Sequence, residues 1–299
     1  EEYHLNVFEQ EKQVDFALTD NVENRVRVNL YRQMGHLAMV MRVINNTIPS
    51  PSDLGLPEEV SIISKMRQGL VIFSGATGSG KSTSMASLLN KINAERYVHI
   101  LTIEDPIEYK FEEQRAIISQ RQIGIDVPSY SLAMKSALRE DPDVILMGEM
   151  RDAESIDIAL TAAETGHLVL STLHAPNSAD AINRIVSTFE GAEQKTIRTK
   201  LAQNLRSIVT QKLLPRLSGT GRAVACEVLQ ISAFARDLII DPERIQDLKD
   251  LIKSGDQGSG NLYFDDYLEH LVREEIISHE VALDNASSVT DLALKLKGF

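Results

Sequence analysis

Four mostly apolar runs in the central part of the chain predict buried strands, and polar residues follow each run directly. The runs are residues 70–73, 99–103, 144–147 and 168–171. After the first run, apolar residues recur at the spacing of one helix face, at Met85, Leu88, Leu89 and Ile92. Because strand-like and helix-like segments alternate, we predict an α/β fold with a largely parallel sheet covered by helices. Ligands bind such sheets beyond the carboxyl ends of the strands.

Both ends of the chain differ from this centre. Short alternating or β-branched runs at 25–30 and 38–43 are typical of a small α+β domain, and 49–57 hold three prolines and a glycine, which favour a linker or hinge. We predict an N-terminal domain at 1–48, truncated because its first residues resemble a domain interior, a linker at 49–57, and a main domain at 58–299. From about residue 193 we expect mainly helix, and a flexible loop at 255–260. One helical stripe is expected at Ile197, Leu201, Leu205, Ile208 and Leu213.

Residues 75–82 match the phosphate-binding pattern G-x-x-x-x-G-K-[ST], at a turn between the first predicted strand and the first predicted helix. Glycines let backbone N–H groups point inward around an anion, and the helix dipole adds to the attraction. Lys81 is expected to reach the β- and γ-phosphates, and the Ser82 hydroxyl to hold Mg²⁺. The residues expected to contact ATP in this loop are Gly75, Ala76, Thr77, Gly78, Ser79, Gly80, Lys81, Ser82 and Thr83.

An acid follows the third predicted strand. Nucleotide hydrolysis needs a carboxylate that orients and deprotonates water opposite the γ-phosphate, and Glu149 stands where that base is needed. A structural ion pair with Arg151 is the alternative. Gly148 takes the place of the usual metal-binding Asp, so Mg²⁺ must rely on Ser82, phosphate oxygens, water and another acid.

Further candidates follow the other strands. Glu104, Asp105 and Glu108 can supply carboxylates around the metal and water, partly through water, and solvated turn acids are the alternative. His167 and His174 bracket the fourth strand; a lone histidine is usually structural, but His174 lies where a γ-phosphate sensor is useful.

Composition narrows the function classes. A net charge of -12, from 43 acidic and 31 basic residues, disfavours a nucleic-acid translocase. The single cysteine, Cys226, excludes an intrachain disulfide and a multi-cysteine zinc site, and we expect it to be a small buried side chain. No apolar stretch approaches the roughly eighteen residues of a membrane span, and no signal peptide opens the sequence, so we expect a soluble intracellular protein.

Taken together, the motifs resemble the hexameric secretion ATPases that drive type IV pilus and type II secretion machines, and most closely the PilT-like pilus retraction motors. The phosphate loop, an acidic box, an atypical second nucleotide motif and a histidine box stand in family order at 75–83, 101–109, 148–152 and 165–174. The stretch 139–143 adds to the match.

The resemblance implies a RecA-like core, a small PAS-like N-terminal domain and a helical C-terminal part. It also implies Mg²⁺-dependent ATP hydrolysis with catalytic roles for Glu149 and Glu104, and ATP contacts from His167 and His174. ATP would lie between the two domains of one chain and the small domain of its neighbour in a homohexamer. Arginines from that small domain would act as fingers, and Arg27, Arg32 and Arg42 occupy matching places, with a solubilising role on exposed strands as the alternative.

The implied location is the cytoplasmic base of a pilus, peripheral to the inner membrane and against a platform protein, without membrane insertion or nucleic acid. Within the family, one cysteine excludes the four-cysteine zinc module of assembly ATPases, which favours retraction. Against this, the retraction motif Ala-Ile-Arg-Ser-Met is matched only by Ile197 and Arg198 in the stretch 196–200. A pilus-assembly or type II secretion ATPase therefore stays an alternative, as does a nucleotide sensor that does not hydrolyse ATP.

Overall fold

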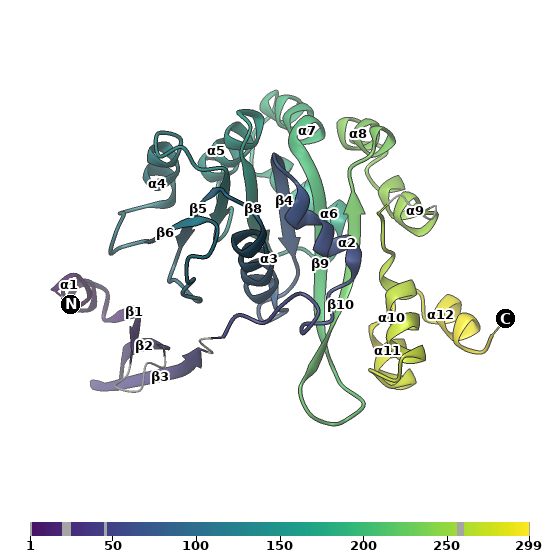
Figure 1. The fold of residues 1–299 in the computed structure, drawn as a ribbon, viewed down its shortest axis with the longest axis horizontal. Helices are drawn as coiled ribbons and strands as arrows, with labels where there is room; N and C mark the ends of the chain where they lie inside the picture. Colours follow the sequence, from purple (N-terminus) through teal and green to yellow (C-terminus); the bar gives the residue numbers. More distant parts are fainter. Residues whose placement is uncertain (1, 20–24, 45–46, 256–259, 299) are drawn as a thin grey trace.

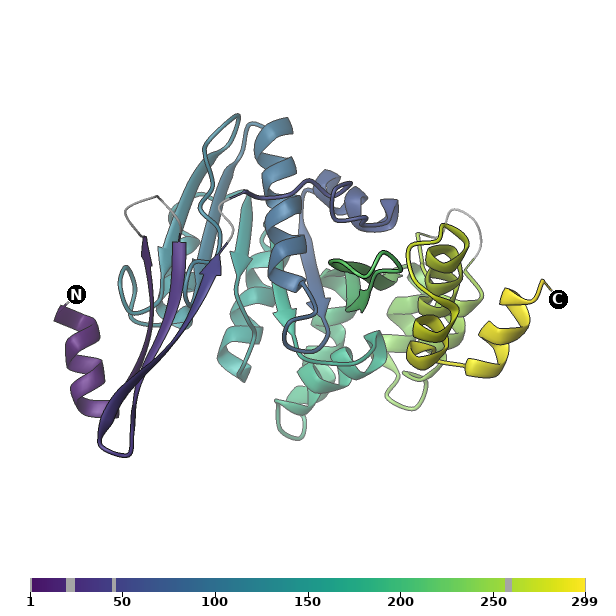
Figure 2. The same ribbon diagram turned by 90° about the horizontal axis from the view of Figure 1, so that it is seen from below.

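Two β-sheets and a C-terminal group of helices make up the protein in a computed structural model that describes residues 2–19, 25–44, 47–255 and 260–298. Figure 1 shows the smaller sheet at one end, the larger sheet between layers of helices in the middle, and the C-terminal helices at the other end. Figure 2, a quarter turn away, shows the same order along the long axis.

The smaller sheet is antiparallel, with the order β1-β2-β3. Helix α1 (Glu2–Glu11) precedes its strands β1 (Gln13–Thr19), β2 (Arg25–Gln33) and β3 (His36–Ile44). The strands predicted at 25–30 and 38–43 are therefore confirmed. The division of the chain into domains at 1–48 and 58–299 with a linker at 49–57 stays a prediction.

The larger sheet has the order β10-β9-β4-β8-β7-β5-β6, parallel except for β10. Its first five strands along the chain are β4 (Gly69–Ser74), β5 (His99–Glu104), β6 (Ile117–Gln122), β7 (Val144–Met147) and β8 (Leu168–Leu173). All four strands predicted in this region are confirmed, and they are neighbours in the sheet. Their carboxyl ends therefore meet at one edge, and the predicted α/β fold is confirmed.

Both faces of this sheet are buried, which explains why its strands are continuously apolar. The helices that cover it are α2 (Glu58–Ser61), the 3₁₀ turn η1 (Ile62–Lys65), α3 (Lys81–Glu95), α4 (Tyr130–Ala137), α5 (Ala153–Glu164), α6 (Ser178–Ser187) and α7 (Glu193–Asn204). Leu70 and Ile72 pack on one side with α4, α5, α6 and α7, whereas Val71 and Phe73 pack on the other side with α3.

The prediction of one helical stripe from Ile197 to Leu213 is wrong. Helix α7 ends at Asn204, and the chain continues as β9 (Leu205–Pro215) and β10 (Arg222–Gln230). Apolar spacing does not separate a buried strand from a buried helix. Here the edge of β4 not used by β8 accepts residues 205–210 as a parallel partner. The prediction of mainly helix from about residue 193 is therefore wrong for 205–230. It holds for α7 before this stretch and for the described helices after it.

From Ala233 onward the described chain is helical. These helices are α8 (Ala233–Ile240), α9 (Asp247–Lys253), α10 (Phe264–Arg273), α11 (His279–Asn285) and α12 (Val289–Leu296). Of the predicted loop at 255–260, residues 256–259 lie outside the described ranges.

Cys226 is fully buried as expected, and burial raises the pKa of its thiol. Across the described residues, no helix combines the length and apolarity needed to cross a bilayer.

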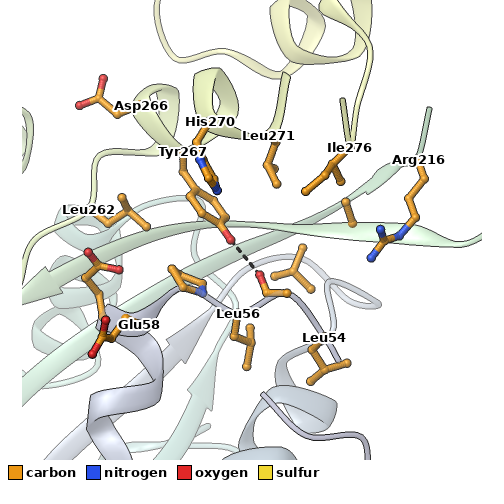
Figure 3. Close-up of a pocket in the computed structure, with 15 residues that line it drawn as sticks. Leu54, Leu56, Glu58, Arg216, Leu262, Asp266, Tyr267, His270, Leu271 and Ile276 are labelled. Carbon is orange, nitrogen blue, oxygen red and sulfur yellow. Dashed lines mark hydrogen bonds between the residues drawn. The ribbon is translucent and has the colours of Figure 1, made fainter. Parts of the chain in front are cut away.

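A hydrogen bond joins the proline-rich segment 49–57 to the C-terminal helices. The Tyr267 hydroxyl of α10 donates to the Gly55 carbonyl at 2.8 Å, beside a pocket of about 470 Å³ (Figure 3). Leu54, Leu56 and Leu271 are among the residues that line this pocket. No residue of the phosphate loop lines it, so we treat it as a feature of how the segment packs.

A close contact between α4 and the residue that follows β7 limits which side chain position 148 can have. A Cβ built on Gly148 would lie 2.7 Å from the hydroxyl of Tyr130, the first residue of α4. That separation is shorter than any normal contact, so a side chain at 148 must displace the phenol. Gly148 therefore cannot be exchanged for the usual metal-binding Asp unless the Tyr130 side chain moves.

We expect Gly148→Ala to lower the free energy of unfolding by about 1–3 kcal/mol through overpacking. Tyr130→Phe should relieve most of this loss, because it removes the hydroxyl. The ring carbon that carried it, Cζ, lies 3.6 Å from the added Cβ, an ordinary contact distance. Urea unfolding of the two single variants and the double variant measures the effect. Equal losses with and without the phenol hydroxyl would show that the contact is unimportant.

Candidate nucleotide-binding site

The predicted phosphate loop forms the turn between β4 and α3. Gly75, Gly78 and Gly80 have φ angles of 137°, 79° and 89°, which glycine adopts without strain. A Cβ on Gly75 would also lie 2.5 Å from the carbonyl oxygen of Gln211. The loop is therefore built directly against β9, and it leads into the N-terminus of α3, where the helix dipole attracts anions.

Lys81 and Ser79 are the buried polar side chains of this loop. Lys81 is 8% exposed, and its ammonium donates to the carbonyls of Gly75 at 2.8 Å and Ala76 at 2.9 Å. Burial lowers the pKa of Lys81, and nearby Glu149 partly offsets this effect. The Ser79 hydroxyl is buried and finds no hydrogen-bond partner among the described residues. Both groups suit a bound phosphate.

Four other residues of the loop are exposed, and its last residue, Thr83, contacts the acidic box. Ala76, Thr77, Gly78 and Ser82 are exposed, so a ligand can reach them. The Thr83 hydroxyl lies 3.0 Å from the Tyr109 hydroxyl, which links α3 to the acidic box. The ATP contacts assigned to these residues stay predictions.

Glu149 lies just beyond β7 with its carboxylate shared between two basic groups. Arg151 Nε donates to one oxygen at 2.7 Å, and His174 Nε2 lies 3.4 Å from the other. The Arg151 side chain is 61% exposed, so this pair contributes little to stability. The ion pair with Arg151 is therefore present, and His174 brings the turn after β8 to the same carboxylate, whereas the catalytic role of Glu149 stays a prediction.

The acidic box follows β5 at the same edge of the sheet. Glu104 accepts a hydrogen bond from Thr102 Oγ1 at 2.7 Å and one from the Glu108 N–H at 3.4 Å, and burial raises its pKa. Asp105 is exposed. Glu108 faces Arg27 of the smaller sheet at 3.6 Å. The box therefore offers one half-buried carboxylate at the end of β5 and one that contacts the smaller sheet.

The predicted metal ligands are compatible with Mg²⁺ only together with phosphate oxygens and water. Within the described ranges, no three His, Cys, Asp or Glu side chains are arranged to hold a metal ion, so Ser82, Glu104, Asp105 and Glu108 form no closed protein cage. Mg²⁺ in nucleotide sites keeps several waters and takes one or two protein ligands plus phosphate oxygens. The exposed Ser82 hydroxyl, with Glu104 acting through water, fits that requirement.

The two histidines lie at opposite ends of β8. The parallel register pairs Gly69 with Leu168 and Ser74 with Leu173, so His174 lies at the phosphate-loop edge and His167 at the other. His167 Nδ1 lies 2.9 Å from the Ala162 carbonyl oxygen at the end of α5. The prediction that His167 contacts ATP with this loop is therefore wrong for this chain, because the length of the strand separates them.

The three candidate arginines do not share one face. Arg27 and Arg42 are direct cross-strand partners in β2 and β3, so they point to the same side, toward which Glu108 also lies. Arg32 is five residues from Arg27 on one strand and points to the opposite side, where its guanidinium lies 5.7 Å from the ring centre of Phe8. The contact with Phe8 therefore gives Arg32 a structural role, whereas Arg27 and Arg42 form a pair on the opposite face.

Two residues of this region carried no signal in the sequence. Tyr130 fills the space beside Gly148, and burial together with nearby Asp105, Glu104 and Glu149 raises its pKa, so it lies among these carboxylates. Ser74, just before the loop, bonds to the turn after β8. Only its position directly before the glycines could have pointed to Ser74.

The stretch 196–200 lies in α7. Ile197 is buried in the core, and Arg198 donates to the Ile239 carbonyl at 3.2 Å and to Asn183 at 3.4 Å. The two residues that match the retraction motif thus hold α7 against α6 and α8.

Comparisons with known proteins identify the family of the chain. The sequence pattern of the family described as Type II/IV secretion system protein matches residues 8–257. The Type IV pilus ATPase PilU of Pseudomonas aeruginosa is 40% identical over 290 residues, which cover 97% of this chain and 75% of PilU. The Type IV pilus retractation ATPase PilT of the same organism is 40% identical over 279 residues, which cover 93% of this chain and 80% of PilT.

A solved structure shows the same fold. The crystal structure of the pilus retraction motor PilT with bound ADP matches with a TM-score of 0.88 and 38% identity, covering 98% of this chain and 83% of that one. The fold, the order of the motifs and these similarities lead to one conclusion: the chain belongs to the Type II/IV secretion system protein family.

Proposed function

We propose that this chain is a motor ATPase that powers pilus retraction, working as a homohexamer at the cytoplasmic base of a pilus and against an inner-membrane platform protein. The observation that carries the proposal is the position of Glu149, which lies at the same sheet edge as the phosphate loop and 3.4 Å from His174 in the turn after β8. The names of PilT and PilU, which match nearly the full chain, support retraction and pilus function.

In this proposal the loop between β4 and α3 binds the triphosphate. Lys81 exchanges its neutral carbonyl partners for phosphate oxygens, which form stronger charge-assisted hydrogen bonds. Ser82, and Glu104 through water, would hold Mg²⁺, which would offset phosphate charge. Glu149 orients and deprotonates the attacking water, and His174 senses the γ-phosphate end of the ligand.

The smaller sheet completes the site with Arg27 and Arg42. Like charges that face each other across two strands repel, and a phosphate between them removes that cost. Residues 49–57 serve as the hinge about which ATP binding closes the two sheets, and hydrolysis lets them reopen. Successive closure around the ring would move the platform protein.

We expect Glu149→Gln to retain ATP binding while hydrolysis falls by about a hundredfold or more, because the general base is lost. Lys81→Ala should instead weaken binding itself, since it removes the charge that faces the phosphates. Phosphate release and binding of a fluorescent ATP analogue separate the two effects. Glu154→Gln is the matched control, because among the described residues that exposed carboxylate pairs only with Lys135 and Ser131. Normal turnover in Glu149→Gln would remove Glu149 from the mechanism.

Mixing two inactive variants tests whether the arginines act on a neighbouring subunit. One variant carries Glu149→Gln, and the other carries Arg27→Ala and Arg42→Ala. In randomly mixed rings, about a quarter of the interfaces would join an intact Glu149 to an intact arginine pair, so turnover should return to roughly that fraction. A mixture that stays inactive would place the arginines on their own chain, beside Glu108. Arg32→Ala should leave turnover unchanged.

Deletion of the gene tests the direction of the motor. Loss of retraction leaves filaments extended, so we expect excess surface pili and loss of twitching motility. Electron microscopy of the surface and a motility assay measure both, and the intact gene should restore them. Absence of pili would instead identify an assembly ATPase.

A further inference from the structure

The turn that carries His174 is held by three contacts from different parts of the fold. Arg184 of α6 donates to the His174 carbonyl at 2.8 Å. Glu227 of β10 accepts from the Ser178 N–H at 3.2 Å and from its hydroxyl at 2.8 Å. The third contact comes from Ser74, the last residue of β4. Together they fasten residues 174–178.

The Ser74 contact is reciprocal and fully buried. Its hydroxyl donates to the Ala175 carbonyl at 2.7 Å and accepts from the Ala175 N–H at 3.1 Å. Ser74 is 0% exposed, so both bonds are shielded from water. One side chain therefore satisfies both backbone groups of the residue that follows His174.

Ser74 also adjoins the phosphate loop, because Gly75 is the next residue. A continuous series of contacts follows: from the loop to Ser74, from Ser74 to Ala175, along the chain to His174, and from His174 to Glu149 at 3.4 Å. The phosphate loop and Glu149 are thereby linked through the Ser74 hydroxyl and His174.

We propose that Ser74 is a positioning residue for hydrolysis, which places the His174 imidazole against Glu149 according to the position of the phosphate loop. This inference rests on the proposed ATPase function. Ser74 itself does not touch the nucleotide. Its loss affects the catalytic step, because a small misplacement of a catalytic group costs rate even where the ligand still binds.

The test compares three substitutions at Ser74. Ser74→Ala removes both hydrogen bonds, Ser74→Cys keeps the approximate shape but bonds only weakly, and Ser74→Thr restores the hydroxyl. We expect kcat to fall by about 10- to 100-fold in the first two variants, with KM for ATP within about twofold of the parent, and to recover in Ser74→Thr. Ser207→Ala is the control, because its equally buried hydroxyl has no hydrogen-bond partner among the described residues.

A second measurement keeps the test valid if Ser74→Ala is unstable. In a His174→Ala background, adding Ser74→Ala should change kcat no further, since the residue acts through His174. Independent, multiplied losses would overturn the proposal, and so would a lower unfolding temperature with unchanged kcat. Glu149→Gln separates the two hypotheses. If it keeps full turnover, the proposed function fails; if it is inactive while Ser74→Ala is normal, only the positioning role fails.

Discussion

The parallel pairing of β4 with β8 is the constraint on which the whole site depends. Its register, from Gly69 opposite Leu168 to Ser74 opposite Leu173, brings the phosphate loop and His174 to one edge of the sheet. β7 pairs with the other side of β8, with Met147 opposite Ser171, so Glu149 comes to the same edge. Strand order alone thus assembles groups that are about a hundred residues apart in sequence, and short side-chain contacts need only adjust them.

The charges at this edge are arranged for a ligand that brings its own charge. Among the described residues, Lys81 is buried with hydrogen bonds only to neutral carbonyls, and burial lowers its pKa, so these residues alone do not fully compensate the ammonium. Arg27 and Arg42 face each other across two strands, and within the described ranges only Glu108 pairs with one of them. A triphosphate with Mg²⁺ would improve both situations, so the proposed binding site and the proposed closure of the smaller sheet have the same electrostatic basis.

The sequence predicted the parts of the site that follow buried strands. Gly75, Glu149 and His174 each follow an apolar run, and such runs end at one edge when they are parallel. Leu205 to Leu213 was mistaken for helix because its spacing suits either structure, and only the open edge of β4 decides. His167 was wrongly grouped with His174, although a whole strand separates them. The Tyr130 contact with Gly148 joins α4 to the end of β7, and no local pattern encodes such a contact.

The strand that the sequence missed is also the one that connects the phosphate loop to the rest of the molecule. Gly75 leaves no room for a Cβ against the Gln211 carbonyl, and the Gln211 amide donates to Ser84 of α3 at 2.9 Å. β9 therefore contacts the loop on both sides. Its hairpin with β10 reaches the C-terminal helices, where the Leu217 N–H donates to Ile276 at 2.8 Å. Because close packing leaves no free space at Gly75, any displacement of the loop would have to be accommodated by β9, whose hairpin with β10 contacts the C-terminal region.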